Sequence, residues 1–396
     1  MKPILRQTVS IERLTGYDSK RYFFGYYDLA AVSQDGNYHL THRIDSADRM
    51  QTATDRCEIG MIRLGDHGYI PLSTTYAWNF QQGTMLQWNP ACPNEEIIYN
   101  VSANHGLCTV VQHVHTSEKR YLPRPVASVS PDGKWGLSIN FARIFWFRGG
   151  YGYACAPDPF TDLCPADDGV FLMNMETGES ELVLSAQTMR ELAKEYLTEE
   201  EYHTHKYVVN HITFNTDGSR FVVLFRCKST DPKRKGWKTL TFTANRDGSE
   251  PYLLLNIMGS HYSWRDPSHI LFFANPFDCP TRGFYLFEDK THNYIEYHPM
   301  QEGDGHCNYS PDRKFFLNDT YYRNGYRKLY LHDVEKDKSV ELAVLRSENP
   351  LYLDDVDMRC DLHARFSPDG SFITFDSVHE GSRQIYRIDM EDIPLP

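Results

Sequence analysis

Seven short segments of the chain share one pattern: an apolar or aromatic residue, a polar turn, and then a run of apolar residues. The three plainest are VSPDGKWGLSI from Val129, YSPDRKFFLND from Tyr309 and FSPDGSFITFD from Phe366. Four others fit the same frame: VSQDGNYHL from Val32, WNPACPNEEIIY from Trp88, FNTDGSRFVVLF from Phe214 and WRDPSHILFF from Trp264. Ser, Pro, Asp and Gly favour tight turns, and the flanking runs have the period of strands. The pattern therefore predicts seven strand–turn–strand units.

A second pair of strands follows most of these units. Examples are GVFLMNMETGESELVL from Gly169, GFYLFEDKTHNYIEY from Gly283, RKLYLHDVEKDKSVEL from Arg327 and RQIYRIDMED from Arg383. Four strands per repeat are typical of β-propeller blades. We therefore expect an all-β fold, a single seven-bladed β-propeller over residues 1–396, with the N-terminal segment TVSIERLTG as the outer strand of the last blade. A β-sandwich or two smaller β domains is the alternative.

One interval between turns, from Ser130 to Asn215, is longer than the others. It contains a stretch rich in Gly, Pro and aromatic residues, Arg143 to Asp168, and a helical pattern over about 186–202. We predict a short helical insertion at about 143–205, between blades 3 and 4. The stretch 143–168 is expected to fold over one mouth of the central channel, because long irregular segments often form binding walls.

The composition of the chain limits the classes of function that the protein can have. The abundance of Tyr (26) and Phe (22) favours strands. A net charge of −12 argues against nucleic-acid binding, which needs a basic face, although a local basic pocket could still hold an acidic ligand. No apolar run approaches the roughly 20 residues that span a bilayer, so no membrane partner is expected. The N-terminus lacks a signal pattern and the nine cysteines include no CxxC pair, which favours a cytoplasmic protein. The sequence indicates no oligomeric state.

A histidine recurs three residues before the aromatic residue of the turn in four consecutive units: His211, His261, His306 and His363. The first three units have Leu29, Met85 and Val126 at this position. Equivalent positions of adjacent blades lie at one depth around the channel, so four imidazoles are expected to converge at one mouth. Such a cluster favours a metal site, with one imidazole free to act as a base. Alternatively, each histidine is a core residue or bridges two blades.

Basic and aromatic residues accompany the histidines. Arg226 ends the strand after His211, and Arg143 and Arg148 flank the aromatic insertion. Arginine suits carboxylate recognition, although a single arginine can equally form a surface ion pair. Four aromatic residues could stack on sugar rings or belong to the blade core: Trp78, Phe80, Tyr151 and Tyr153.

The repeated turns resemble those of TolB-type propellers. The motifs HCNYSPD at His306 and HARFSPD at His363 resemble those of the oligogalacturonate lyase family, and the resemblance covers the repeats from about Val208 onward. It implies a cytoplasmic seven-bladed β-propeller that cleaves short uronic-acid oligosaccharides by β-elimination. It also implies Mn²⁺ held by histidines, a histidine base and an arginine.

Residue by residue, the resemblance implies that His306 and His363 are metal ligands. It implies a base at His261 and an arginine at Arg226. His211 is a further catalytic candidate, because it shares the register of the other three histidines.

The chain departs from the family before its last turn. Where the family has a glutamine and a second histidine, this sequence has Met358 and Asp361. Asp361 could replace one ligand, whereas a thioether suits Mn²⁺ poorly. Either His211 completes the coordination sphere, or the chain holds a different metal or none.

These residues favour a carbon–oxygen lyase, a polysaccharide lyase of carbohydrate metabolism acting on an acidic oligosaccharide. A neutral histidine would take the C5 proton of a uronate while metal and arginine stabilise the charge that develops on its carboxylate. One alternative is a glycoside hydrolase that uses carboxylates near the channel mouth, among them Asp28, Asp304 and Asp361. Another is a non-catalytic propeller that binds a glycan or a protein.

Overall fold

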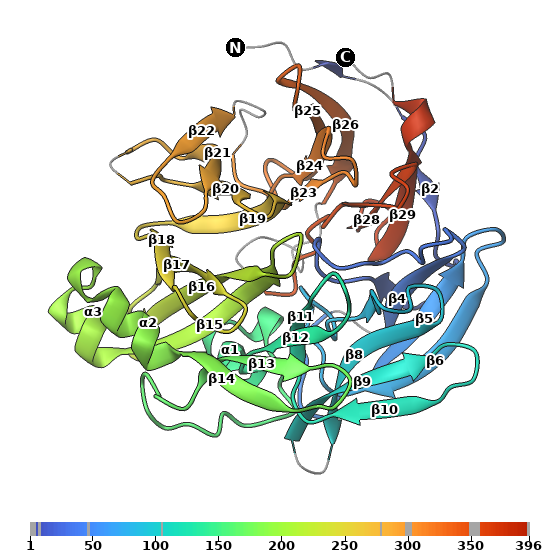
Figure 1. The fold of residues 1–396 in the computed structure, drawn as a ribbon. Helices are drawn as coiled ribbons and strands as arrows, with labels where there is room; N and C mark the ends of the chain where they lie inside the picture. The colour runs from blue at the N-terminus through green and yellow to red at the C-terminus, as the bar shows by residue number, and fades with distance from the viewer. Residues whose placement is uncertain are drawn as a thin grey trace.

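Seven antiparallel sheets are arranged in a ring around a central axis (Figure 1). The computed structural model describes residues 5–6, 9–45, 48–103, 106–277, 279–297, 303–347 and 357–393. The predicted seven-bladed β-propeller is confirmed. The first strands of neighbouring blades contact each other, as β11 and β15 or β19 and β23 do, which places them at the centre.

The blades follow one another along the chain. Blade 1 has β3 (Arg21–Phe23), β4 (Tyr38–Ile44), β5 (Cys57–Arg63) and β6 (Tyr69–Thr75). Blade 2 has β7 (Gln87–Trp88), β8 (Glu96–Ala103), β9 (Gly106–His113) and β10 (Lys119–Leu122). Blade 3 has β11 (Val126–Val129), β12 (Trp135–Ser138), β13 (Gly169–Asn174) and β14 (Ser180–Ser185). Blade 4 has β15 (His205–Phe214), β16 (Arg220–Ser229), β17 (Lys238–Asn245) and β18 (Tyr252–Leu255).

The remaining blades are built in the same way. Blade 5 has β19 (Gly259–Asp266), β20 (His269–Ala274), β21 (Gly283–Glu288) and β22 (Tyr294–Tyr297). Blade 6 has β23 (Cys307–Tyr309), β24 (Phe315–Asp319), β25 (Tyr326–Asp333) and β26 (Lys338–Arg346). Blade 7 has β27 (Arg365–Phe366), β28 (Phe372–Ser377) and β29 (Gln384–Asp389).

The N-terminal segment closes the ring, as the sequence predicts. β2 (Glu12–Arg13) is the fourth strand of blade 7 and pairs antiparallel with β29, Glu12 opposite Arg387. Upstream of it, β1 (Leu5–Arg6) pairs in parallel with β26 of blade 6. β2 and β29, from opposite ends of the chain, therefore share one sheet (Figure 1).

The recurring turns join the first and second strands of their blades because side chains hold them. In blade 3, Ser130 Oγ donates to Asp132 Oδ1 at 2.6 Å and accepts from the backbone N–H of Trp135 at 2.9 Å. The Ser310–Asp312 pair of blade 6 repeats this contact at 2.7 Å. The turn chemistry read from the sequence thus explains the boundaries of these strands.

Side chains that alternate between the two faces of each strand fill the space between neighbouring blades. On β16, Phe221, Val223 and Phe225 pack into the large core shared by blades 1 to 4. Val222 and Leu224 point the other way, against residues of blade 5. Both faces of a blade are therefore buried, which explains why the predicted strands appear as continuous apolar runs.

The long interval differs from the prediction. The expected insertion at 143–205 is divided, because β13 and β14 lie inside it and complete blade 3. Its first part carries α1 (Phe141–Phe147) and the turn η1 (Gly149–Tyr151). Its second part carries α2 (Ala186–Leu192), η2 (Lys194–Tyr196) and α3 (Glu199–Thr204).

The helix expected over about 186–202 is interrupted at Thr198. This residue caps α3, and its backbone N–H binds the carboxylate of Glu201 in a capping box, so a second helix begins there. In the described part of the chain, no helix combines the length and apolar character needed to cross a membrane.

Candidate active site

A short segment of blade 1 occupies the centre of the ring, and we call residues 25–28 (Gly-Tyr-Tyr-Asp) the tyrosine plug. Tyr27 Oη donates to the carbonyl of Tyr262 in blade 5 at 2.9 Å, and the Tyr27 carbonyl accepts from Asn308 of blade 6 at 2.5 Å. Asp28 bonds His211 of blade 4. Through Tyr27 and Asp28, the plug therefore ties blade 1 to blades 4, 5 and 6 across the axis.

Gly25 allows the chain to enter the centre. Its φ of +126° lies in a region that side chains disfavour, and a Cβ there would lie 2.9 Å from the carbonyl oxygen of Gln82. The sequence analysis did not identify the plug, although FFGYYD is an unusual run immediately before the turn of blade 1.

The four aligned histidines surround Tyr27. Its ring centroid lies 5.2 to 6.3 Å from the imidazole centroids of His211, His261, His306 and His363. The rings of His261 and His306 are 4.0 Å apart, and those of His306 and His363 are 4.2 Å apart. The shared register of the motifs thus brings all four imidazoles together at one depth.

His306 and His363 have their free nitrogens turned toward each other, with the two Nε2 atoms 3.2 Å apart. Nδ1 of His306 lies 2.9 Å from the Asp319 carboxylate, and Nδ1 of His363 lies 2.9 Å from the Gly25 carbonyl. Both partners are acceptors, so each Nδ1 donates its proton, and when both rings are neutral the two Nε2 lone pairs face each other. Two imidazole nitrogens at about 2.1 Å from one ion would be roughly 3.0 to 3.4 Å apart. The pair fits a divalent cation, which would remove this repulsion.

Asp361 is the third member of this cluster. Its carboxylate and the two imidazoles each offer a ligand atom within 4.8 Å of the others. Burial alone would raise the pKa of Asp361, but Arg359 and Arg327 hold it well below its usual range, so the group is ionised. Each of these arginines donates to it at 2.8 Å. Met358 packs instead in an apolar cluster with Phe23 and is not part of the site.

Asp319, which the sequence analysis did not single out, holds His306 and His363 in place. Its carboxylate accepts from the backbone N–H of His306 at 2.8 Å and from that of His363 at 3.0 Å, besides the imidazole. His363 has a φ of +44°, an unfavourable conformation that this bond helps to hold. A sequence signal exists: an aspartate stands nine residues after the turn serine in both YSPDRKFFLND and FSPDGSFITFD.

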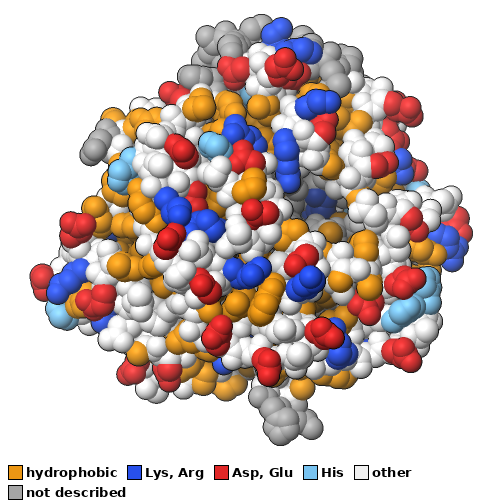
Figure 2. All heavy atoms as spheres, in the orientation of Figure 1, with side chains coloured by type: hydrophobic (Ala, Val, Ile, Leu, Met, Phe, Trp, Pro, Cys, Tyr) orange, Lys and Arg blue, Asp and Glu red, His pale blue; other side chains and the backbone are white. Residues whose placement is uncertain are grey.

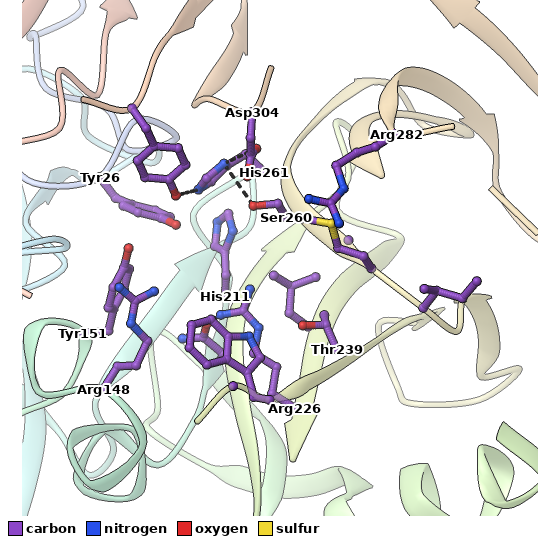
Figure 3. A pocket seen from close by; sticks show the side chains of 18 of the residues that line it. Tyr26, Arg148, Tyr151, His211, Arg226, Thr239, Ser260, His261, Arg282 and Asp304 are labelled. Carbon is purple, nitrogen blue, oxygen red and sulfur yellow. Dashed lines mark hydrogen bonds and ion pairs between the residues drawn. The ribbon is translucent and has the colours of Figure 1, made fainter. Parts of the chain in front are cut away.

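His261 and Asp304 form a first dyad in the cavity (Figure 3). Nδ1 of His261 lies 2.9 Å from Asp304 Oδ1, and Nε2 lies 3.4 Å from the hydroxyl of Tyr321. Burial, followed by the neighbouring His306, lowers the pKa of His261. The imidazole is therefore neutral near pH 7, with Nε2 available to accept a proton.

His211 and Asp28 form a second dyad. His211 Nε2 lies 2.5 Å from Asp28 Oδ2, and its ring stacks on Tyr262 at 4.3 Å. Its Nδ1 is buried and has no hydrogen-bond partner among the described residues. The stacked ring and the carboxylate fix the orientation of this imidazole.

The dyads face a cavity of about 710 Å³ with an arginine-rich wall (Figure 3). The arginines that line it are Arg148, Arg226, Arg282 and Arg359. Arg226 donates to Asn210 at 2.6 Å, while its Nε is buried without a partner in the described structure. Burial, and then Arg148, lower the pKa of Arg226, yet a guanidinium remains charged at neutral pH. The space-filling view also shows a hollow in the ring, with Lys or Arg side chains beside and within it (Figure 2).

Tyr151 and Arg148 are the insertion residues that line the cavity. Arg148 lies over the Tyr151 ring at 4.5 Å and pairs with Asp357 at 3.0 Å. The Tyr151 hydroxyl accepts from Arg359 at 2.6 Å. Arg282 and Trp237 also line it and were not selected from the sequence, because no motif marks them.

Two predicted substrate residues lie elsewhere. Arg143 is buried in the insertion, where it pairs with Asp158 at 3.0 Å and donates to the Tyr207 carbonyl at 2.6 Å, so its role is structural. Trp78 is buried and its Nε1 donates to the carbonyl of Asp55 at 2.8 Å. Neither residue lines the cavity, because both are held within the packing around the blades.

Phe80 and Tyr153 also lie away from the cavity. Phe80 packs on Trp78, and Tyr153 stacks on Phe141 with a ring separation of 4.4 Å. The blade-core alternative is therefore correct for both rings.

No protein-family model and no curated protein matches this sequence. Among solved structures, the chain is similar to an oligogalacturonate lyase from Vibrio parahaemolyticus, with a TM-score of 0.64 and 16% identity over 96% of this chain and 93% of that one. It is also similar to an oligogalacturonate lyase in complex with manganese, with a TM-score of 0.66, 14% identity and the same coverage. For TolB from Acinetobacter baumannii the TM-score is 0.41, with 11% identity over 90% of this chain and 81% of that one. At these identities the likeness concerns the fold, and the chain is a seven-bladed β-propeller like those of the oligogalacturonate lyases.

Proposed function

We propose that this protein is a metal-assisted lyase that cleaves oligosaccharides containing uronic acid by β-elimination. The observation that carries the proposal is the pair of facing Nε2 atoms of His306 and His363 beside the neutral His261–Asp304 dyad. His261 and Arg226, whose Nε has no partner in the described structure, line the cavity. The candidate cation ligands are buried behind them, with the ring of His306 4.0 Å from that of His261. Acidic sugars offer the carboxylate that these groups would recognise.

His306 and His363 would hold the divalent cation, with Asp361 as the nearest third donor. The manganese complex of a structural neighbour makes Mn²⁺ the first ion to test. When bound, the cation would stabilise the negative charge that develops on the uronate carboxylate as C5 loses its proton. Arg226 would bind the same carboxylate from the cavity wall.

His261 is the proposed base. Its Nε2 takes the C5 proton, and Asp304 stabilises the imidazolium that forms. The C5–H electron pair becomes the C4–C5 double bond, and the bond from C4 to the glycosidic oxygen breaks. The imidazolium form of His211, paired with Asp28, would donate its Nδ1 proton to the departing oxygen, so protons and electrons balance.

The alternative of a glycoside hydrolase has less support. Asp28 and Asp304 each bond a histidine, and Asp361 bonds two arginines. A hydrolase needs one carboxyl group that stays protonated near neutral pH, whereas Arg359 and Arg327 hold the pKa of Asp361 well below its usual range. The nine cysteines are unpaired, which supports a reducing compartment such as the cytoplasm as part of this proposal.

The test is ultraviolet absorbance on uronate oligosaccharides with Mn²⁺, because the unsaturated product absorbs and a hydrolysis product does not. We expect His306→Ala and His363→Ala to lose bound metal and turnover together, whereas His203→Ala, at an exposed ion pair, should keep both. Full metal content and full activity in both cluster variants would overturn the lyase assignment. If the protein binds the oligosaccharides but forms no product, it is a non-catalytic propeller that binds glycans.

A further inference from the structure

Two arginines of blade 7 are buried close to the metal-site cluster. Arg365 lies on β27, two residues after His363, and Arg383 precedes β29. Their relative exposures are 2% and 0%. Neither lines the cavity of the dyads, so the proposed elimination gives them no role.

These arginines share one carboxylate at long range. Asp376 lies 3.6 Å from Arg365 Nη2 and 3.5 Å from Arg383 Nη2, and it is also 3.3 Å from the backbone N–H of Phe24. All three guanidinium nitrogens of Arg365, together with Nε and Nη1 of Arg383, have no hydrogen-bond partner in the described part of the chain. Five buried nitrogen donors are therefore unsatisfied.

One face of each guanidinium group is covered by an aromatic ring. Arg365 lies over the ring of Phe24 and Arg383 over the ring of Phe23, each at 4.5 Å. Stacking on an aromatic ring does not provide a hydrogen-bond acceptor for the N–H groups. These groups point outward in the guanidinium plane and need acceptors there.

The neighbouring groups do not neutralise the charge. His39 bonds Thr374 and the Leu40 carbonyl, and burial, followed by Arg365, lowers its pKa to about 3, so it is neutral. Asp28, the next carboxylate, bonds His211 and forms no hydrogen bond or ion pair with either arginine in the described structure. Two guanidinium groups therefore share the single carboxylate of Asp376, which leaves one of them without a carboxylate of its own.

We propose that Arg365 and Arg383 bind one small monovalent inorganic anion of the size of chloride. Water could accept the free N–H groups but would leave the buried charge, which is costly in an apolar interior. A monovalent anion satisfies the donors and balances the charge. The near-complete burial of both arginines favours a monatomic ion over a larger oxyanion or a sugar carboxylate.

The direct test is crystallographic. Crystals of the full chain grown in sodium bromide should show an anomalous peak between the two guanidinium groups, at hydrogen-bonding distance from both. Anomalous maps that show no bromide, with water in that position, would overturn the proposal. This experiment uses the wild-type chain, so it does not depend on whether a variant folds.

The solution test compares melting temperature in sodium chloride and in sodium gluconate at constant ionic strength. Above the dissociation constant, each tenfold rise in chloride should raise the wild-type midpoint by about 2 °C. Arg365→Met, which keeps the length of the side chain, should lose this dependence. Arg49→Met, at an exposed pair with Asp55, is the matched control and should keep it. Equal midpoints of the wild type in both salts would contradict the site.

Discussion

At the scale of single residues, the site depends on how imidazoles are oriented. His261 and His306 each bond a carboxylate through Nδ1, and His363 bonds the carbonyl of Gly25. These bonds choose the tautomer, so Nε2 is the nitrogen left for a cation or a substrate proton. Two predictions concern this layer of contacts.

Asp319→Asn should weaken metal binding. The asparagine amide keeps the shape of the side chain, but its NH2 group cannot accept a hydrogen bond, so only one of the two polar atoms can still accept from the three donors. Loss of such a supporting contact typically costs about 10- to 100-fold in metal affinity. Titration with Mn²⁺ would measure it, and Asp312→Asn, in the exposed turn of the same blade, is the control that should bind normally. An unchanged affinity would show that Asp319 does not position the ligands.

The pH profile of turnover should report His261. Burial and His306 lower its pKa below the ordinary value of about 6.5, so the neutral base persists to lower pH. We expect the acid limb of the kcat/KM profile, which reports this base, to lie on the acid side of 6.5. His261→Ala should abolish turnover while the metal content stays the same. An acid limb centred above 6.5 would argue against this histidine as the base.

At the scale of elements, the tyrosine plug decides which groups meet. It is a break in the first strand of blade 1. Its Gly25 carbonyl bonds blade 7, the hydroxyl and carbonyl of Tyr27 bond blades 5 and 6, and the Asp28 carboxylate bonds blade 4. Blade 1 has no histidine in the shared register, so it contributes to the site through this segment instead.

Gly25→Ala should displace the plug. The new Cβ meets the Gln82 carbonyl at 2.9 Å and the φ of +126° becomes strained, so His363 loses its acceptor. We expect lower stability, by about 1 to 3 kcal/mol, together with lost metal binding. Gly36→Ala is the matched control, because it also has a positive φ, of +74°, but no atom within 4 Å. Chemical denaturation and metal titration of the two variants separate backbone strain from displacement. Equal metal binding by both would contradict the role of the plug.

At the scale of the whole molecule, closure of the ring buries polar groups at the centre as well as apolar side chains between blades. His39 and His42 are fully buried, and burial is the main reason that the pKa of each falls to about 3. The folded state therefore disfavours their protonation, whereas the unfolded chain binds protons near pH 6.5.

The free energy of unfolding should consequently decrease as the pH is lowered. The pKa of each histidine is lower in the folded state than in the unfolded chain. Above pH 6.5 neither histidine affects the free energy of unfolding. As the pH drops from 6.5 toward 3, each lowers the free energy of unfolding by up to about 1.4 kcal/mol per pH unit. Urea unfolding at pH 7 and pH 5 measures the difference. His39→Gln should be less sensitive to pH than the wild type, even if it is less stable at pH 7. A variant with the same pH dependence as the wild type would show that His39 does not contribute.

The sequence alone determined the blade count, the ring closure and the convergence of the four histidines. Those features follow from local rules: a Ser–Asp turn ends one strand and begins the next, and residues such as His306 and His363 keep one register in adjacent repeats. A repeat fold turns equal sequence positions into equal depths, so the pattern could be read without coordinates.

The tertiary structure alone decided the partners of those histidines. Asp28 lies 183 residues from His211, and Gly25 lies 338 residues from His363, and no local pattern joins such pairs. The same holds for Arg143 and Trp78, whose residue types suit sugar binding but whose side chains are held in buried contacts. Local sequence specifies turns and strand faces, whereas contacts across the central axis arise only when the ring closes and brings distant segments together.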